Sequence, residues 1–458
     1  MRLNLASLAY DLPEDILKKK WAGDFDGVKR AIDRRLSKDN LSPMMRDRLM
    51  VEKANIDRWE KRFPYTREEA IEIMKKRCAD FTEAEFDAME DDGCMDFIYV
   101  NGVKKYVRSF GGTLIHMSSD LAAREFDKES DEEHNRLEEN IDRMIANGRT
   151  AWKYRIRKGV RMDDDSFVPG ETYLCHIPVP ARCSQQSAEE IEVIPQKGGF
   201  VSDVNEAQRT VAYTRTLNEN ESFEVEFSFV ARMNYCDPMK DEAHIVYPDT
   251  DAPTADDLSE QAPHILFTPY LRQLAAQIAG DETDKVVLAR RVYDYVTQNV
   301  RYSYMRTYAL IDRHAEYAAL NHKGDCGIQA ILFITLCRIL GIPARWQSGL
   351  TVDREGTGNH DWAQFYTEKF GWLFADPSFG GSAWRKQNLR RWNFYFGNLD
   401  PFRMIANRRY QTDFNPNKSF ERFDPYDNQD GEIENSVRGY DNVEFDDYAK
   451  TLEYTMLY

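Results

Sequence analysis

Three side chains of the types that catalyse acyl transfer follow one another in the second half of the chain. Cys326 stands in a Gly-Asp-Cys-Gly segment, and His360 and Asp376 come after it in that order. A cysteine, a histidine and a carboxylate can form a nucleophilic site in which the imidazole takes the proton of the thiol and the carboxylate orients the imidazole. Cys326, His360 and Asp376 are therefore the candidate catalytic residues.

The segment after Cys326 predicts the element that positions the thiol. Residues 328–340 form the most apolar helical segment of the sequence, and Gly-Ile-Pro at 341–343 is typical of a helix end. Cys326 is then expected at the helix N-terminus, where free N–H groups and the helix dipole stabilise a thiolate. The neighbouring carboxylate of Asp325 opposes that ionisation.

Two aromatic-rich segments predict the hairpin that positions the other two side chains. Residues 360–366 and 372–376 have the composition of short strands joined by a turn. If the turn is centred near Lys369, His360 lies on the same face as Asp376 and within diagonal reach of it. A slip of one residue in the register would put the two side chains on opposite faces.

The order of these motifs resembles a known family. The motifs are Gly-x-Cys before an apolar helix, Gly-Ile-Pro-Ala-Arg at 341–345, His-Asp-Trp at 360–362, and Gly-Trp at 371–372 followed by Asp-Pro at 376–377. Together they resemble the transglutaminase-like superfamily, in its bacterial multidomain form, over roughly residues 264 to 405, about a third of the chain. The resemblance implies a papain-like core in which Cys326 is the nucleophile, His360 acts as base and then as acid, and Asp376 orients His360. The sequence departs from the family pattern at Asp361, where a small residue usually follows the histidine.

An acyl-transfer site also needs donors for the tetrahedral oxyanion, each of which contributes about 3 kcal/mol. The backbone N–H of Cys326 is the natural first donor. For the second donor, Tyr302, Tyr304 and Gln329 are all open. Trp362 is the tryptophan that we expect to line the acyl site or to stack on a substrate.

Composition limits the classes of partner. The formal net charge of the 458 residues is −17, although residues 264–410 hold 19 Lys and Arg against 13 Asp and Glu. The acidic balance of the chain disfavours nucleic acid as a partner. A basic cluster in the core leaves open either an acidic substrate or a solvated face; it consists of Arg385, Lys386, Arg390 and Arg391.

The same survey predicts no cofactor and no metal. Seven cysteines without a Cys-x-x-Cys pair indicate neither a disulfide framework nor a zinc site. Nucleotide, metalloprotease and serine-hydrolase motifs are missing, and an EF-hand frame on Gly431 would put Tyr426 and Val437 at calcium-ligand positions. No apolar run is long enough for a membrane span, and the first residues do not form a signal peptide, so we expect a cytoplasmic protein. A secreted protein trimmed of its leader would have the same features.

Changes in hydrophobic period predict an α+β multidomain fold. Apolar residues recur at helical spacing in the first part of the chain, interrupted by a hairpin signal at Asn101-Gly102, and alternate as in strands from about residue 151. The expected regions are a mainly helical N-terminal domain (1–150), an antiparallel β-sandwich (151–235), a linker (236–263), a papain-like core with the cysteine-bearing helix packed on an antiparallel sheet (264–410), and an acidic C-terminal tail (411–458). We expect the tail to be solvated or to lie as a strap across another domain.

These residues predict a thiol enzyme that acts on peptide or carboxamide bonds through a thioester. We expect hydrolysis, as in a cysteine protease or amidase, because nothing in the sequence marks an amine tunnel or a calcium switch. Two alternatives stay open, a protein-glutamine transamidase and a non-catalytic scaffold with the same fold. The expected partner is a peptide or protein substrate, with neither nucleic acid nor membrane.

Overall fold

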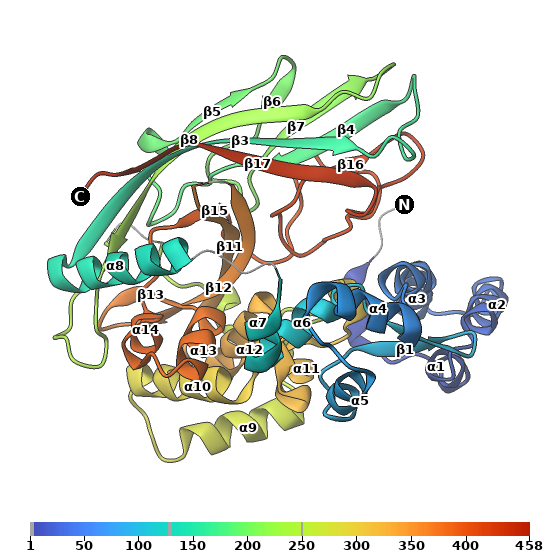
Figure 1. The fold of residues 1–458 in the computed structure, drawn as a ribbon, viewed down its shortest axis with the longest axis horizontal. Helices are drawn as coiled ribbons and strands as arrows, with labels where there is room; N and C mark the ends of the chain where they lie inside the picture. Colours follow the sequence, from blue (N-terminus) through green and yellow to red (C-terminus); the bar gives the residue numbers. More distant parts are fainter. Residues whose placement is uncertain (1–3, 127–130, 249–250, 355) are drawn as a thin grey trace.

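The computed structural model of the protein describes residues 4–126, 131–248, 251–354 and 356–458. Figure 1 shows a β-sandwich at the top, a core of helices and a curved sheet below it, and a group of N-terminal helices at the right. The α+β multidomain fold predicted from the sequence is confirmed. None of the helices in the described part of the chain is both long and apolar enough to cross a membrane.

Short capped helices make up most of the N-terminal region. Ser42 caps a helix that begins at Pro43, and Thr66 and Glu69 form a capping box at the start of the next one. The elements are η1 (Leu5–Ala9), α1 (Glu14–Trp21), α2 (Phe25–Leu36), α3 (Pro43–Arg62), α4 (Arg67–Arg77), α5 (Glu83–Asp91), α6 (Phe110–Met117) and α7 (Ser119–Arg124).

One hairpin interrupts these helices, where the sequence predicts it. Strands β1 (Phe97–Val100) and β2 (Val103–Tyr106) pair in antiparallel fashion. Asn101 and Gly102 between them have positive φ angles of 47° and 87°, which a tight two-residue turn of this kind requires. The predicted hairpin is confirmed.

Helix α8 (Asp131–Asn147) lies apart from the other N-terminal helices and against the core, at the left of Figure 1. Glu138 forms ion pairs with both Arg390 and Arg391, and Arg390 also pairs with Asp142. Two members of the basic cluster that left open an acidic substrate therefore already have acidic partners within the chain.

Two antiparallel sheets of four strands each form the β-sandwich. Their orders are β16-β4-β7-β6 and β17-β3-β8-β5. Phe223, Val225, Phe227 and Phe229 of β8 are buried, so the predicted alternation in this strand is confirmed. The elements are β3 (Arg149–Met162), β4 (Thr172–Pro178), η2 (Ala188–Glu190), β5 (Glu192–Pro195), β6 (Gly199–Val201), β7 (Thr210–Thr216), β8 (Phe223–Asn234), β16 (Glu432–Glu434) and β17 (Phe445–Met456).

The C-terminal segment completes both sheets of the sandwich. Strand β17 pairs along β3 from Phe445 opposite Met162 to Met456 opposite Trp152, and β16 pairs with β4. The expected solvated tail is therefore wrong, and the alternative of a strap across another domain describes residues 411–458. The sequence pattern missed β17 because it is an edge strand in which every residue but Phe445 is half-exposed or exposed, which leaves a weak apolar alternation.

A five-stranded antiparallel sheet with the order β14-β13-β12-β11-β15 forms the centre of the core. Helix α12 packs on one face of it, where the rings of Phe333 and Phe365 have centroids 5.9 Å apart. This confirms the predicted packing of the cysteine-bearing helix on an antiparallel sheet. The elements are η3 (Ala255–Leu258), α9 (Pro269–Ala279), α10 (Lys285–Asn299), β9 (Arg301–Tyr302), η4 (Tyr308–Leu310), α11 (His314–Asn321), β10 (Lys323–Gly324), α12 (Cys326–Ile339), β11 (Ala344–Val352), β12 (Thr357–Thr367), β13 (Gly371–Ala375), α13 (Pro377–Arg385), α14 (Leu389–Phe394), β14 (Phe396–Gly397) and β15 (Arg403–Asn407).

The docking of β17 on β3 predicts a paired effect at two facing residues. Gly159 lies opposite Tyr448, and a Cβ atom at position 159 would overlap the Tyr448 ring. Gly159→Ala is expected to lower the free energy of unfolding by about 1 to 3 kcal/mol, because the added methyl overpacks this contact. In a Tyr448→Ala background, Gly159→Ala is expected to leave the free energy of unfolding unchanged. Urea unfolding measures both effects, and a Gly159→Ala variant as stable as the wild type would contradict the docking.

Candidate active site

The candidate site is built at the start of helix α12. Asp325 is the N-cap residue, and its carboxylate accepts hydrogen bonds from the backbone N–H of Ile328 at 3.1 Å and from the hydroxyl of Tyr308. Cys326 follows as the first helical residue and is half-buried, whereas Cys337 on the same helix is fully buried. The predicted position of Cys326 at a helix N-terminus is confirmed.

The thiol of Cys326 donates a hydrogen bond to the carboxylate of Asp361 in strand β12. The distance from Sγ to Oδ2 is 3.3 Å. The other oxygen of Asp361, Oδ1, accepts a hydrogen bond from the side chain of Gln429 in the C-terminal segment. A helix start and the C-terminal segment therefore both contact the side chain of Asp361 on a central strand.

Gly327 makes room for this contact. A Cβ atom at position 327 would lie 2.7 Å from Oδ2 of Asp361 and 2.9 Å from the ring of Trp346, and it would overlap the hydroxyl of Tyr308. These contacts are too close for any side chain. The glycine after the cysteine is therefore what lets Asp361 reach the thiol.

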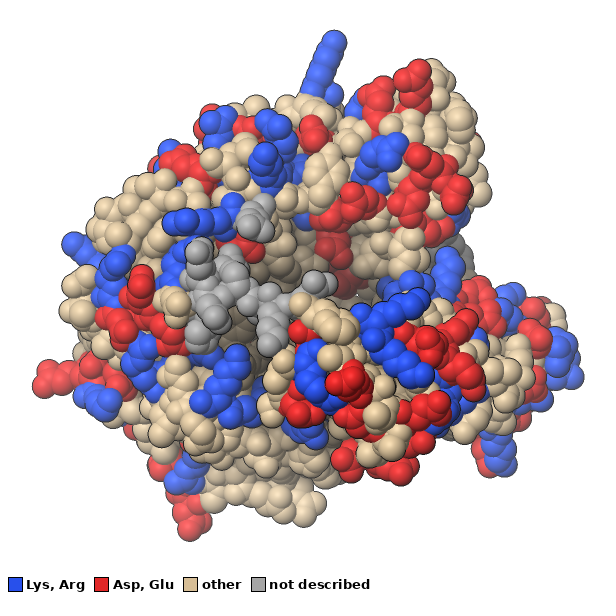
Figure 2. Space-filling model, viewed as in Figure 1, with Lys and Arg blue, Asp and Glu red and all other residues tan. Residues whose placement is uncertain are grey.

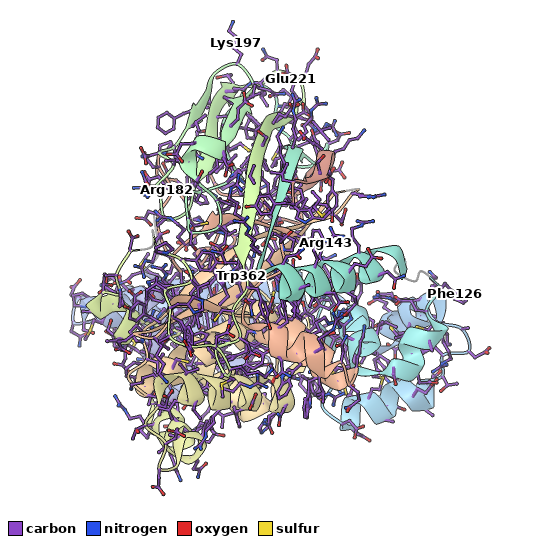
Figure 3. All side chains as sticks on the ribbon, turned by 90° about the vertical axis from the view of Figure 1, so that its left-hand side faces the viewer. Phe126, Arg143, Arg182, Lys197, Glu221 and Trp362 are labelled. Carbon is purple, nitrogen blue, oxygen red and sulfur yellow. The ribbon has the colours of Figure 1, made fainter. Side chains whose placement is uncertain are left out.

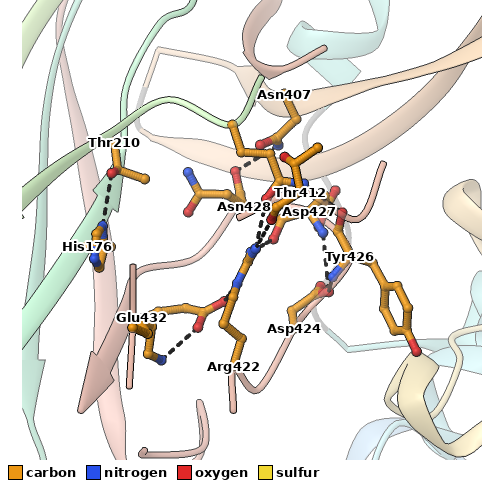
Figure 4. Close-up of polar contacts among 12 residues, drawn as sticks. His176, Thr210, Asn407, Thr412, Arg422, Asp424, Tyr426, Asp427, Asn428 and Glu432 are labelled. Carbon is orange, nitrogen blue, oxygen red and sulfur yellow. Dashed lines mark hydrogen bonds and ion pairs between the residues drawn. The ribbon is translucent and has the colours of Figure 1, made fainter. Parts of the chain in front are cut away.

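The segment formed by residues 424–430, which we call the acidic strap, covers the Asp361 side of the site. Asp427 accepts a hydrogen bond from Ser348 of β11 at 2.7 Å, and Gln429 donates to the backbone carbonyl of His360 at 2.9 Å. Figure 4 shows the strap beside a buried ion pair, in which Arg422 donates to Glu432 at 2.7 Å. The strap is thus fixed at its base and is part of the site.

Buried carboxyl groups raise the pKa of the thiol. Burial, and after it the charges of Asp361 and Asp325, raise the pKa of Cys326 well above the ordinary thiol value. Burial likewise raises the pKa of Asp361 to about 7 and that of Asp325 to about 6. It also raises the pKa values of Asp424 and Asp427 in the acidic strap well above that of a free aspartate. The resting state of Cys326 at neutral pH is therefore the protonated thiol.

The other two predicted catalytic residues form a separate buried pair. Nε2 of His360 lies 2.8 Å from Oδ2 of Asp376, and the guanidinium of Arg403 lies 2.7 Å from the same oxygen. Burial acts to raise the pKa of Asp376, but the charges of His360 and Arg403 outweigh it and hold that pKa at about 2. The backbone N–H of Phe379 also donates to this carboxylate, at 2.9 Å. Asp376 is thus ionised and held on three sides.

The register of the hairpin explains the contact between His360 and Asp376. Ala363 of β12 pairs with Ala375 of β13, which centres the turn on Lys369. This is the predicted register, and the predicted contact of the imidazole with the carboxylate is confirmed.

Residues 272–377 match the model of the transglutaminase-like superfamily. This segment of the chain belongs to that superfamily. It contains Cys326, His360 and Asp376, together with the strand that carries Asp361.

Solved structures with low sequence identity show a looser likeness to about half to two thirds of the chain. A candidate cysteine protease from Cytophaga hutchinsonii is 14% identical, with 67% of this chain and 89% of that chain covered and a TM-score of 0.40. The periplasmic domain of TgpA from Pseudomonas aeruginosa is 13% identical, with 56% and 96% covered and a TM-score of 0.26. A candidate protease from Parabacteroides distasonis is 8% identical, with 48% and 42% covered and a TM-score of 0.22. No curated protein matches the sequence.

The transglutaminase-like core does not bring Cys326 and His360 together in this structure. Side chains of consecutive residues in a strand point to opposite faces of the sheet. Asp361 shares the face of Phe365, on which α12 packs, and His360 shares the face of Trp362. No hydrogen bond joins Cys326 to His360 among the described residues, so the expected thiol–imidazole contact is replaced by a thiol–carboxyl contact.

Sequence reasoning singled out Asp361 only as a departure from the family pattern. The signal that could have identified its role is the alternation of side chains between the two faces of the strand. If α12 packs on the face that carries the alternate residues Asp361, Ala363 and Phe365, the residue that faces the start of the helix is Asp361. The hydrophobic pattern does not reveal that choice of face, because residues 360–365 are buried on both sides of the sheet.

Two of the remaining candidates are committed to other contacts. Trp362 is fully buried at the centre of the molecule and donates its indole N–H to Gln347 at 2.7 Å (Figure 3). The expectation that Trp362 lines the acyl site is therefore wrong. Gln329 is also buried, and its amide donates to the backbone carbonyl of Gly324 at 2.9 Å.

The other two candidates, Tyr302 and Tyr304, lie in and just after strand β9, which pairs with the residues that precede Cys326. Tyr302 pairs with Gly324 in the short parallel β9–β10 ladder, and burial followed by the charge of Cys326 raises the pKa of its hydroxyl. Tyr304 is 40% exposed and packs against His116 of helix α6. Tyr302 is thus the candidate whose hydroxyl is coupled most directly to the thiol.

The described residues hold no group of three or more His, Cys, Asp or Glu side chains placed to bind a metal ion. On the face shown in Figure 2, acidic side chains lie at the hollow between the β-sandwich and the N-terminal helices.

The raised pKa of Asp361 predicts that stability falls with rising pH. An unfolded aspartate titrates near about 4, whereas the folded chain raises this pKa to about 7. The folded state keeps a proton that the unfolded state releases, so this stabilisation is full below about pH 4 and is lost as the pH rises through about 7. Between about pH 5 and about pH 8 the free energy of unfolding is expected to fall by at least about 1 kcal/mol more in the wild type than in Asp361→Asn.

Urea unfolding at the two pH values measures this difference. The Asn side chain keeps the shape of Asp361 and cannot titrate, whereas Asp325, Asp424 and Asp427 are present in both chains. Equal pH dependence in the two chains would contradict the buried, proton-binding state of Asp361.

Proposed function

We propose that the protein is a thiol acyl-transfer enzyme that hydrolyses peptide or carboxamide bonds through a thioester on Cys326. The observation that carries the proposal is the half-exposed thiol at the start of α12, hydrogen-bonded to an acid–base group within a transglutaminase-like core. A nucleophile within hydrogen-bond reach of a base is the arrangement that covalent catalysis requires.

The proposed reaction has two stages. The sulfur of Cys326 attacks the carbonyl carbon, the amine leaves with a proton, and the acyl group stays on sulfur as a thioester. Water then attacks the thioester and releases the acid. The backbone N–H of Cys326, at the free end of the helix, is the first donor for the oxyanion, and the hydroxyl of Tyr302 is our choice for the second.

Observations at the site also favour a second, non-catalytic function. The thiol is protonated at rest and its contact is with a carboxyl group, which does not activate a sulfur as an imidazolium does. A scaffold that keeps the core for shape alone would tolerate such a thiol. Activity that depends on Cys326 separates the two functions.

The test is cleavage of a peptide library in the presence of a fluorescent alkylamine. The hydrolysis proposal predicts products that contain a new carboxyl end and that fall at least about a thousandfold in Cys326→Ala. Cys183→Ser is the matched control, because Cys183 is the other half-buried cysteine and lies in the sandwich region. Amine incorporation that depends on Cys326 would show transamidation in place of hydrolysis. If neither product depends on Cys326, the non-catalytic scaffold function is the one that remains.

A further inference from the structure

We propose that Arg301 and Arg385 form a subsite for an acidic side chain of the substrate peptide, an inference that rests on the proposed function and gives its substrate class. Arg385 is the last residue of α13 and belongs to the basic cluster that left open an acidic substrate. Arg301 is the first residue of β9. Helix α13 packs against β9, which brings the two elements together.

Strand β9 connects this subsite with the thiol. Tyr302 of β9 pairs with Gly324, two residues before Cys326, and the charge of Cys326 contributes to the raised pKa of the Tyr302 hydroxyl. Arg301 is the residue before Tyr302, and consecutive side chains of a strand point to opposite sides. Arg301 therefore lies beside the acyl site and not in it. The acidic side chain is expected at a residue near the bond that is cleaved.

Two helix ends hold the guanidinium groups in place. Arg301 donates to the backbone carbonyl of Met117, the last residue of α6, at 3.2 Å. The side chain of Arg385 lies over Gly381, where an added Cβ atom would be 3.3 Å from its Nη1 and 3.3 Å from the carbonyl oxygen of Thr297 in the last turn of α10. The carbonyl end of a helix favours a cation. Because a guanidinium has five N–H donors, a bond to one carbonyl leaves donors for an anion.

The charges of these two arginines are not balanced within the chain. In the ranges that the structure describes, neither Arg301 nor Arg385 forms an ion pair, and both are exposed. Other arginines nearby do have partners, since Arg290 of α10 pairs with Asp294 at 2.6 Å and two members of the basic cluster pair with α8. Desolvation, and after it the charge of Arg301, lowers the pKa of Arg385. A carboxylate near both groups would be attracted by both.

The charge of the rest of the molecule makes such a site selective. The chain has a formal net charge of −17, whereas residues 264–410 hold 19 Lys and Arg against 13 Asp and Glu. An acidic peptide is repelled by a surface that is negative overall, and the two guanidinium groups offer it charge-assisted N–H···O bonds. A carboxylate on the substrate is therefore guided to a place beside the thiol.

Matched peptides test the subsite. Quenched-fluorescent peptides that carry Glu, Gln or Lys at one position at a time, and are otherwise identical, are incubated with the full chain. The measured quantity is the kcat/KM of the cleavage that depends on Cys326. At a position near the cleaved bond, the Glu peptide is expected to react at least about tenfold faster than the Gln peptide, and added salt is expected to reduce this ratio.

Reversal of the two charges separates recognition from a structural effect. Arg301→Glu combined with Arg385→Glu is expected to invert the preference, so that the Lys peptide reacts at least about tenfold faster than the Glu peptide at the same position. Damage to the fold would lower both rates and would not create a preference for Lys. Arg272→Glu is the matched control and is expected to keep the preference for Glu. Arg272 is an exposed arginine of α9 that donates to the backbone carbonyl of Phe267 at 2.9 Å.

A binding measurement makes the test independent of the chemistry at the thiol. Fluorescence anisotropy of a labelled peptide of six glutamates is measured with Cys326→Ala and with the same variant carrying both charge reversals. The peptide is expected to bind at least about tenfold more tightly to the first chain. Because neither chain has the thiol, this difference does not depend on catalysis.

The outcomes distinguish the subsite from the proposed function. Equal cleavage of the Glu and Gln peptides at every position, or a preference for Glu that survives the double reversal, would overturn the inference and leave the proposed function intact. Absence of any cleavage that depends on Cys326 would remove the proposed function. In that case, loss of peptide binding on charge reversal would still support an arginine site for acidic peptides, and unchanged binding would overturn it.

Discussion

Strand β12 presents consecutive residues to opposite faces of its sheet, and the arrangement of the site depends on this constraint. Once α12 packs on the face of Phe365, the start of the helix meets Asp361, and His360 is committed to the other face. A strand paired on both sides cannot shift by one residue without exchanging every buried side chain. The thiol–carboxyl contact therefore follows from the packing of the core.

The cost of burying several carboxyl groups shapes the rest of the site. Isolated carboxylates are expensive to remove from water, so these groups keep their protons or share them. The exception is Asp376, which stays ionised because Arg403 and His360 lie against it. On one face of the sheet, the ionised Asp376 is therefore bound by His360 and Arg403. On the other face, carboxyl groups with raised pKa values lie near the sulfur of Cys326.

Much of this could be predicted from the sequence, because the signals are local. The helix that begins at Cys326, the turn centred on Lys369 and the contact of His360 with Asp376 follow from capping, period and register. The face on which the helix packs is a tertiary choice, and a strand buried on both sides carries no pattern that records it. The C-terminal strands were missed for a related reason. Strand β17 is held by pairing along the long strand β3, and its own sequence has only a weak apolar pattern.

The contact between a protonated thiol and a carboxyl group can be observed directly by infrared spectroscopy of the S–H stretch. The structure predicts an S–H band at neutral pH that disappears in Cys326→Ala and moves to higher wavenumber in Asp361→Asn, because a neutral amide is a weaker acceptor than a carboxylate. A wild-type spectrum without a band from Cys326, as expected for a thiolate paired with the imidazolium of His360, would contradict it.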